Sequence, residues 1–173
     1  MTISQDLEKI GSRVQEKRRN FETYDFGPAR DDALLTFFDL AQEYDALENL
    51  YRVAVCVIQE FFRLNSRLYL ISPENRLELV CDSLAGVRTD KTPPPAYVRQ
   101  ASQAYGEQGS WIVPIRGNLM LVNLLPFYAQ EQVMGMLEVF PAQDLSDNDR
   151  FFFEKYANRL GYNLHTKDRK SVV

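Results

Sequence analysis

The stretch between Met120 and Phe140 constrains the fold of this chain more than any other. Two apolar runs, at 120–127 and 133–140, flank a polar segment at 129–132. Runs of this length that are apolar on both faces are typical of strands covered on both sides of a sheet. We therefore predict a central antiparallel hairpin with residues 129–132 at its tip.

Counting from this tip sets the predicted register. With Tyr128 opposite Val133, Asn123 faces Glu138 across the hairpin, so these two polar side chains share one face. The face opposite them would be apolar and would carry Val122, Leu124, Leu137 and Val139. A slip of one residue would turn every side chain of a strand over. Gly135 indicates that another group packs close to this backbone.

Helical and strand-like patterns surround the hairpin. Helices are predicted over 3–22, 31–62 with a bend near 42–45, 96–105 and 147–164, and strands over 67–72, 77–81 and 111–115, with a loop at 83–93. In the earlier hairpin we pair Leu68 with Cys81 and Leu70 with Leu79. Five or more antiparallel strands with helices on both faces make an α+β sandwich.

Three local signals refine this assignment. Pro114 favours an edge strand, because proline cannot donate to a neighbouring strand. Ser146 and Asp149 have the spacing of a capping box at the start of the last helix. We divide the chain into an N-terminal helix and linker (1–28), a folded domain (29–165) and a polar tail (166–173).

The N-terminal helix carries a narrow apolar stripe. Ile3, Leu7, Ile10 and Val14 step by four, three and four residues. Such a stripe suits either a two-stranded coiled coil or docking onto the domain. We take these four residues as a candidate homodimer interface.

Composition excludes several classes of protein. Hydrophobic residues make up 45% of the 173 residues and charged residues 25%, which is ordinary for a globular protein. The net charge of −4 argues against a nucleic-acid partner. No apolar run is long enough to span a membrane, and the N-terminus lacks a signal-peptide pattern. A cytoplasmic protein is therefore expected.

The chain contains one histidine, His165, and two dispersed cysteines, Cys56 and Cys81. This set predicts neither a metal site nor a cofactor, and the thiols are expected in the core.

Four segments together resemble a GAF domain, a relative of the PAS fold found in bacterial signalling proteins such as sensor histidine kinases. They are Ser66–Ile71, Leu121–Pro126, Met134–Val139 and Leu145–Asp149, within a likeness that covers about residues 45–164. The resemblance implies a five- or six-stranded antiparallel sheet. The terminal helices would cover one face, and a short helix and loops the other, where ligand-binding members enclose a pocket. It also implies dimerisation through the terminal helices and an output domain such as a histidine kinase.

The motifs of family members with identified ligands are missing from this chain. We find no cyclic-nucleotide signature, no cysteine–histidine pair for a bilin and no cysteine cluster of the sulfoxide reductase type. We therefore expect a non-enzymatic sensor module for a small molecule. The alternatives are a ligand-free dimerisation module and, third, a GAF-type redox enzyme.

Six residues are candidates for ligand binding: Tyr69, Tyr97, Trp111, Arg116, Asn123 and Glu138. Aromatic walls with a polar tip suit heterocyclic ligands, and a few polar groups can orient a ligand in an apolar pocket. The alternative for the aromatic residues is core packing. The alternative for Glu138 is a structural bond, under the terminal helix, to Asn123 or to a nearby basic residue.

Overall fold

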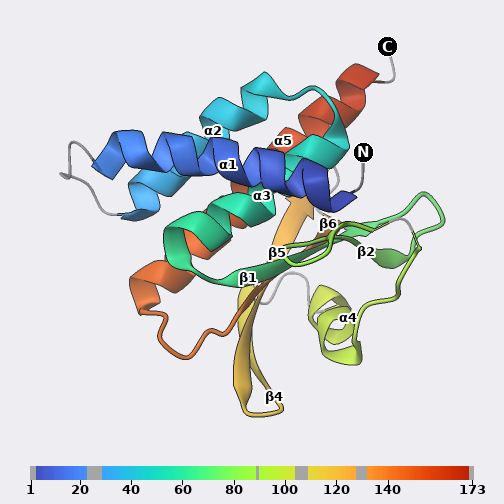
Figure 1. Ribbon diagram of the computed structural model, residues 1–173. Coiled ribbons are helices and arrows are strands. Elements are labelled where there is room, and N and C mark those ends of the chain that lie inside the picture. The colour runs from blue at the N-terminus through green and yellow to red at the C-terminus, as the bar shows by residue number, and fades with distance from the viewer. Residues whose placement is uncertain (1–2, 23–28, 89, 104–108, 128–131, 172–173) are drawn as a thin grey trace.

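The computed structural model describes residues 3–22, 29–88, 90–103, 109–127 and 132–171 (Figure 1). Its helices are α1 (Ile3–Glu22), α2 (Ala29–Glu43), α3 (Leu47–Phe62), α4 (Ala96–Gln103) and α5 (Asp147–Ser171). Its strands are β1 (Asn65–Ile71), β2 (Leu77–Asp82), β3 (Gly86–Val87), β4 (Ser110–Ile115), β5 (Asn118–Phe127) and β6 (Gln132–Phe140). The short strand β3 falls within the loop predicted at 83–93.

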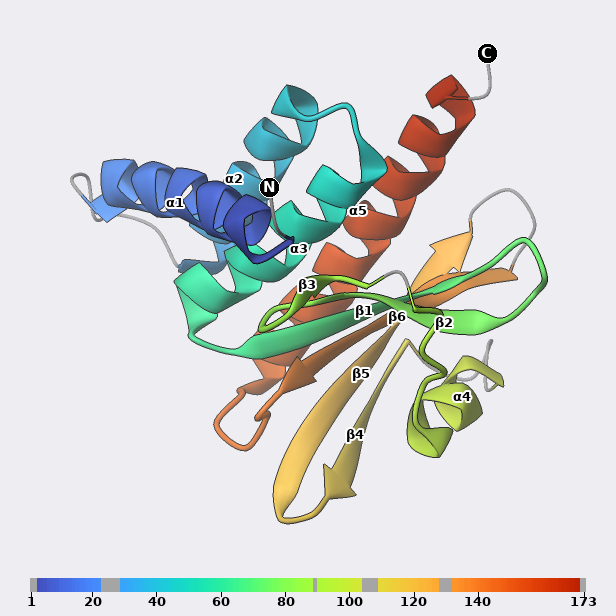
Figure 2. The same cartoon turned by 45° about the vertical axis from the view of Figure 1, so that its right-hand side comes forward.

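Within the described ranges the strands form one six-stranded antiparallel sheet in the order β3-β2-β1-β6-β5-β4. Helices α1, α2, α3 and α5 lie on one side of the sheet, and α4 lies on the other (Figures 1 and 2). The predicted α+β class is thus confirmed, as is the edge position of the strand that contains Pro114. No helix in the described part of the chain combines the length and the apolar character that crossing a bilayer requires.

Two apolar clusters lie on the two faces of the sheet. The larger one joins the helical layer to the sheet and includes Leu68, Leu121, Leu125, Leu137 and Val139. The smaller one lies towards α4 and consists of Tyr69, Leu79, Val98, Ala101, Val122, Leu124 and Met136. Apolar residues of β5 and β6 therefore alternate between two buried faces.

The register of the central hairpin differs from the predicted one by one residue. Asn123 pairs with Leu137, and Val122 pairs with Glu138. The reason is a register shift between Leu125 and Pro126, where the ladder moves by one residue on β6. The predicted Asn123–Glu138 pair is therefore wrong, because the two side chains lie on opposite faces of the sheet. The predicted tip residues 129–131 lie outside the described residues.

The same shift corrects the predicted apolar face. Val122 and Leu124 belong to the cluster under α4, whereas Leu137 and Val139 belong to the cluster under the other helices. The prediction that all four residues share one face of the sheet is therefore wrong.

The β1–β2 hairpin also contains an irregularity. Leu68 pairs with Cys81 as predicted, but the register shifts between Leu68 and Tyr69. Tyr69 rather than Leu70 therefore lies opposite Leu79, so the predicted Leu70–Leu79 pair is wrong.

Helix boundaries follow local signals closely. The predicted bend separates α2 from α3. At the start of α5, the Ser146 hydroxyl accepts from the Asp149 amide, and the Asp149 carboxylate accepts from the Ser146 amide, both at 3.1 Å. Helix α5 continues past its predicted end at Leu164, since residues 163–171 contain neither glycine nor proline. The ammonium of Lys167 also donates to the Tyr44 carbonyl and holds this part of α5 to the helical layer.

Helix α1 docks onto α3 of its own chain. Ile10 is 3% exposed and Val14 is fully buried, and Leu7 packs at the edge of the larger cluster. Of the two alternatives for this stripe, docking onto the domain is the arrangement observed. A dimer interface formed by Ile10 and Val14 would require α1 to leave α3. The side chain of Ile3 lies outside the described residues.

Candidate functional site

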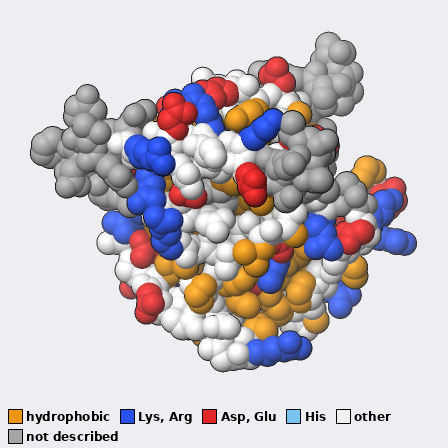
Figure 3. All heavy atoms as spheres, viewed as in Figure 1, with side chains coloured by type: hydrophobic (Ala, Val, Ile, Leu, Met, Phe, Trp, Pro, Cys, Tyr) orange, Lys and Arg blue, Asp and Glu red, His pale blue; other side chains and the backbone are white. Residues whose placement is uncertain are grey.

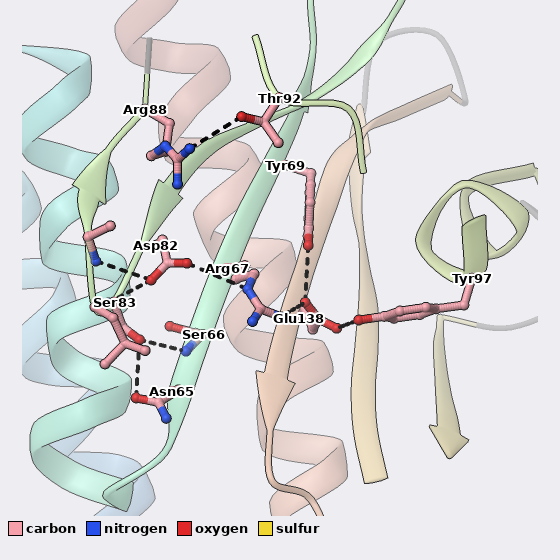
Figure 4. Close-up of polar contacts among 12 residues, drawn as sticks. Asn65, Ser66, Arg67, Tyr69, Asp82, Ser83, Arg88, Thr92, Tyr97 and Glu138 are labelled. Atoms are coloured by element: carbon pink, nitrogen blue, oxygen red, sulfur yellow. Dashed lines mark hydrogen bonds and ion pairs between the residues drawn. The ribbon is translucent and has the colours of Figure 1, made fainter. Parts of the chain in front are cut away.

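A buried carboxylate lies at the centre of the sheet face that α4 covers. Glu138 on β6 has no exposed surface. Its Oε1 accepts from Arg67 Nη1 at 2.9 Å and from the Tyr69 hydroxyl at 3.1 Å, and its Oε2 accepts from the hydroxyl of Tyr97 (Figure 4). The charge of Glu138 is thus compensated by one cation and two phenols, as a buried carboxylate requires.

Strand pairing explains why these groups meet. Arg67 on β1 lies directly opposite Glu138 on β6. Tyr69 is two residues further along β1 and therefore points to the same face. Tyr97 comes from the first turn of α4, whose residues Val98 and Ala101 pack on the same side of the sheet. Two neighbouring strands and one helix therefore build the site.

Arg67 is held by three groups. Besides Glu138, its guanidinium contacts Asp82, with Nε 3.5 Å from Oδ2, and lies over the Phe140 ring with Cζ 4.2 Å from the centroid. Burial lowers the pKa of Arg67, but the hydrogen bond and charge of Glu138, together with Tyr69 and Asp82, outweigh burial, and the pKa is raised. The guanidinium is therefore a fixed positive partner for the carboxylate.

Both phenols stay protonated around neutral pH. Burial, together with the adjacent Glu138 charge, raises the pKa of Tyr69 and of Tyr97 well above the ordinary tyrosine value. Each hydroxyl can therefore act as a constant hydrogen-bond donor to Glu138.

The structure brings together three of the six candidate ligand-binding residues, namely Tyr69, Tyr97 and Glu138. Trp111 on β4 is half-buried and packs against the apolar cluster beside them. Arg116 is exposed in the turn between β4 and β5, where its φ is +50°.

Asn123 lies on the other face of the sheet. Its Nδ2 donates to the Leu137 carbonyl at 3.3 Å, and its buried Oδ1 accepts no hydrogen bond within the described residues. It therefore cannot act together with Glu138.

Sequence reasoning did not single out Arg67. Glu138 does bond a nearby basic residue, but the pair lies on the face that α4 covers and not under the terminal helix, where that alternative placed it. Arg67 lies two residues before Tyr69, so the two share a strand face. That spacing was visible in the sequence, but the pairing of β1 with β6 was not.

The thiols lie apart from this site. Cys56 and Cys81 are buried and form no disulfide with each other. Burial raises the pKa of each thiol to about 12. Thiolate, the reactive form, is therefore scarce at neutral pH. Among the described residues, histidine, cysteine and acidic side chains form no group that could hold a metal ion.

Apolar surface accompanies the buried carboxylate. Figure 3 shows hydrophobic side chains gathered over the lower part of the view, where α4 and the β4–β5 hairpin lie in Figure 1, with Lys, Arg, Asp and Glu side chains towards its edge. Half-buried Tyr97, Trp111 and Val113 belong to the cluster in this region. The site therefore combines an apolar wall with one buried acceptor, the usual composition of a small-molecule site.

No protein-family model and no curated protein matches the sequence. Solved structures do match. The GAF domain of a phosphoenolpyruvate-protein phosphotransferase from Acinetobacter superposes with a TM-score of 0.66 at 14% identity, over 86% of this chain and all of that chain. The GAF domain of the potassium sensor histidine kinase KdpD from Escherichia coli gives 0.59 at 13% identity, over 81% and 96%.

A free methionine-R-sulfoxide reductase from Neisseria meningitidis also matches, with a TM-score of 0.59 at 16% identity, over 82% of this chain and 91% of that chain. The chain therefore has the fold of a GAF domain, as its sequence motifs predict. At sequence identities this low, structural similarity shows the fold alone. The function must therefore be argued from the residues of the site.

Proposed function

We propose that this chain is a non-enzymatic regulatory module that binds a small molecule between the sheet and α4. It would pass the signal through its terminal helices to an output domain such as a histidine kinase, as a homodimer. The observation that carries the proposal is the buried carboxylate of Glu138, whose Oε2 accepts a hydrogen bond from Tyr97 of a short helix.

The two carboxylate oxygens differ in their partners. Oε1 is held by Arg67 and Tyr69 of the sheet, whereas Oε2 is held by Tyr97 of α4. A ligand that donates an N–H group to Oε2 could replace the Tyr97 hydroxyl without leaving the charge unpaired. A heterocyclic amine fits best, because its ring would lie against Trp111 and its N–H would meet the carboxylate.

Such a replacement would move α4 relative to the sheet. Strand β6 carries Glu138 and lies between β1 and β5, and α5 packs on β5. A ligand shifts this arrangement only if it binds two states with different affinity. Similar structures include GAF domains of sensor histidine kinases, which is consistent with a regulatory role.

A redox enzyme is the less favoured function. One similar structure is a methionine sulfoxide reductase. In this chain, however, Cys56 and Cys81 are buried in the cluster beneath the helices, on the opposite face from Glu138. Their raised pKa values disfavour the thiolate that reductase chemistry would need.

A library of heterocyclic amines tests the proposal by thermal unfolding and by amide hydrogen exchange of residues 96–103. We expect at least one compound to raise the unfolding temperature and to change exchange in α4. Glu138→Gln should abolish the effect, and Glu8→Gln, at an exposed position of α1, should preserve it. A compound whose effect survives Glu138→Gln would contradict the proposed site.

The second candidate function is a ligand-free dimerisation module. It is favoured by the fact that both oxygens of Glu138 already have partners within the chain. A dimer in light scattering, together with no stabilising compound from the library, would support this candidate over the sensor.

A further inference from the structure

A hollow of about 760 Å³ opens between the β1–β2 turn, the segment that precedes α4, and α4 itself. This volume lies within the usual range for small-molecule sites. None of Tyr69, Tyr97, Trp111 and Glu138 lines it, so it is distinct from the site under α4.

Three cationic side chains converge on this hollow from three separate segments. Arg76 follows the β1–β2 turn, Lys91 belongs to the loop after β3, and Arg99 belongs to α4. None of the three side chains makes a hydrogen bond or an ion pair with another described residue. All three residues are exposed, so their charges face the open hollow, where an anion could reach them.

Two carboxylates also line the hollow. Glu74 is bound at the turn by its own backbone amide and by Ser72, and these contacts, with Lys91 nearby, lower its pKa. Glu78, on β2, makes no ion pair within the described residues and also borders a groove on the other side of the strand. Cations therefore exceed carboxylates by one, three against two.

The neighbours of Lys91 in the sequence, Asp90 and Thr92, make several hydrogen bonds. Asp90 accepts from Arg88 and from Thr92, each at 2.7 Å, and Thr92 accepts from the Leu79 amide at 3.0 Å through its carbonyl. Lys91 itself has a φ of +54°, a conformation that costs a non-glycine residue free energy. Such positions occur preferentially where a side chain is held for a ligand.

The rest of the lining combines an apolar part, made by four residues, with the polar residues Asn75, Ser102 and Gln103. Ile71 and Leu77 lie at the ends of β1 and β2, and Pro93 and Pro94 precede α4. We propose that this hollow binds a small organic anion, whose carboxylate or phosphate group meets Arg76, Lys91 and Arg99 while its uncharged body lies on the apolar wall. Charge-assisted contacts to two guanidinium groups would orient such a group.

Arg99 also connects the hollow to the first site. It lies two residues after Tyr97 on the same short helix, so an anion that draws Arg99 inwards acts on the helix that covers Glu138. The two sites would then share one moving element.

An NMR titration of the ¹⁵N-labelled chain tests this proposal. Phenyl phosphate and benzoate are the anions, phenol is the neutral control, and amide chemical shifts are the readout. We expect saturable shifts at 74–78, 91–94 and 99–103 with at least one anion and none with phenol. Arg76→Gln/Arg99→Gln should weaken binding by about tenfold or more. The matched pair Arg18→Gln/Arg63→Gln lies at a different hollow, between α1 and α3, and should leave affinity unchanged. Whichever of phenyl phosphate and benzoate binds more tightly shows whether the hollow prefers a phosphate or a carboxylate group.

Absence of saturable shifts, or equal affinity in Arg76→Gln/Arg99→Gln, would overturn the proposal. Inorganic phosphate that binds as tightly as phenyl phosphate would overturn the assignment of the apolar wall. Glu138→Gln keeps all three cations of the hollow and should still show saturable shifts at 74–78 and 91–94, so failure of this site and failure of the site under α4 are distinguishable.

Discussion

The hydroxyl of Tyr97 on α4 donates to Oε2 of Glu138 on β6, while Arg67 on β1 binds the other oxygen of the same carboxylate. One buried side chain thus joins the helix on one face of the sheet to two central strands. Replacing either partner should therefore affect more than one element.

The coupling between Arg67 and Glu138 should be measurable by a double-mutant cycle. Glu138→Gln should lower the free energy of unfolding by about 2 kcal/mol, because it leaves the guanidinium beside a neutral group. Arg67 keeps Asp82 as a second partner and is 28% exposed, which limits the loss. With Arg67→Met as the second change, urea unfolding should give a coupling of about 1 kcal/mol. Glu8→Gln is the control, and an equal effect of the two glutamate changes would contradict the ion pair.

Ionisation of Tyr69 and Tyr97 should be delayed in the folded protein. Both pKa values are raised, so the folded state keeps its phenols neutral above about pH 10, where unfolded tyrosine loses its proton. Their contribution to stability is therefore complete below about pH 10 and is lost as pH rises towards the folded values.

Tyrosinate absorbance during alkaline titration measures this effect. Tyr97→Phe should remove one late-titrating group from the alkaline titration curve. If the number of tyrosines that ionise only at high pH were unchanged in Tyr97→Phe, the pKa of Tyr97 would not be raised.

Two glycines should respond to alanine in opposite directions. A Cβ at Gly135 would lie 2.1 Å from the Tyr69 carbonyl oxygen, so Gly135→Ala must separate β6 from β1 and should cost about 3 kcal/mol or more. At Gly11 in α1 the nearest atom is Cys56 Sγ at 3.9 Å, so Gly11→Ala should stabilise by about 0.5–1 kcal/mol. Urea unfolding of the two variants measures the change in the free energy of unfolding for each. A mild effect at Gly135 would refute the close approach of these strands.

Docking of α1 can be distinguished from dimerisation by concentration. Ile10→Ala should lower the free energy of unfolding by about 2–4 kcal/mol, and the loss should be the same at all protein concentrations, since Ile10 is buried within its own chain. Leu35→Ala, at an exposed position of α2, should change it by less than about 0.5 kcal/mol. A loss at Ile10 that grows with protein concentration would instead indicate an interface between chains.

Local patterns predicted the local elements. The break between α2 and α3, the Ser146–Asp149 capping box and the edge strand with Pro114 each depend on neighbouring residues, and the structure contains all three. The GAF fold was predictable from the order of these elements and four short motifs.

Register was not predictable to the same degree. Residues 120–127 are apolar on both faces, so no alternation of polar and apolar residues distinguishes one register from the next. A single shift beside Pro126 then decides that Glu138 faces α4 and Asn123 faces the helical layer. Arg67 was missed for a related reason. Its role depends on the pairing of β1 with β6, two strands far apart in the sequence.

The capping box at Ser146 begins a helix that runs without interruption for 25 residues to Ser171. At 1.5 Å per residue, α5 is a lever of about 37 Å. A tilt of about 5° at its capped end, where it rests on the sheet, would displace its far end by about 3 Å. An adjustment of the sheet that tilted α5 as a rigid rod and broke the contact of Lys167 with Tyr44 would therefore move the far end of the helix further than its capped end.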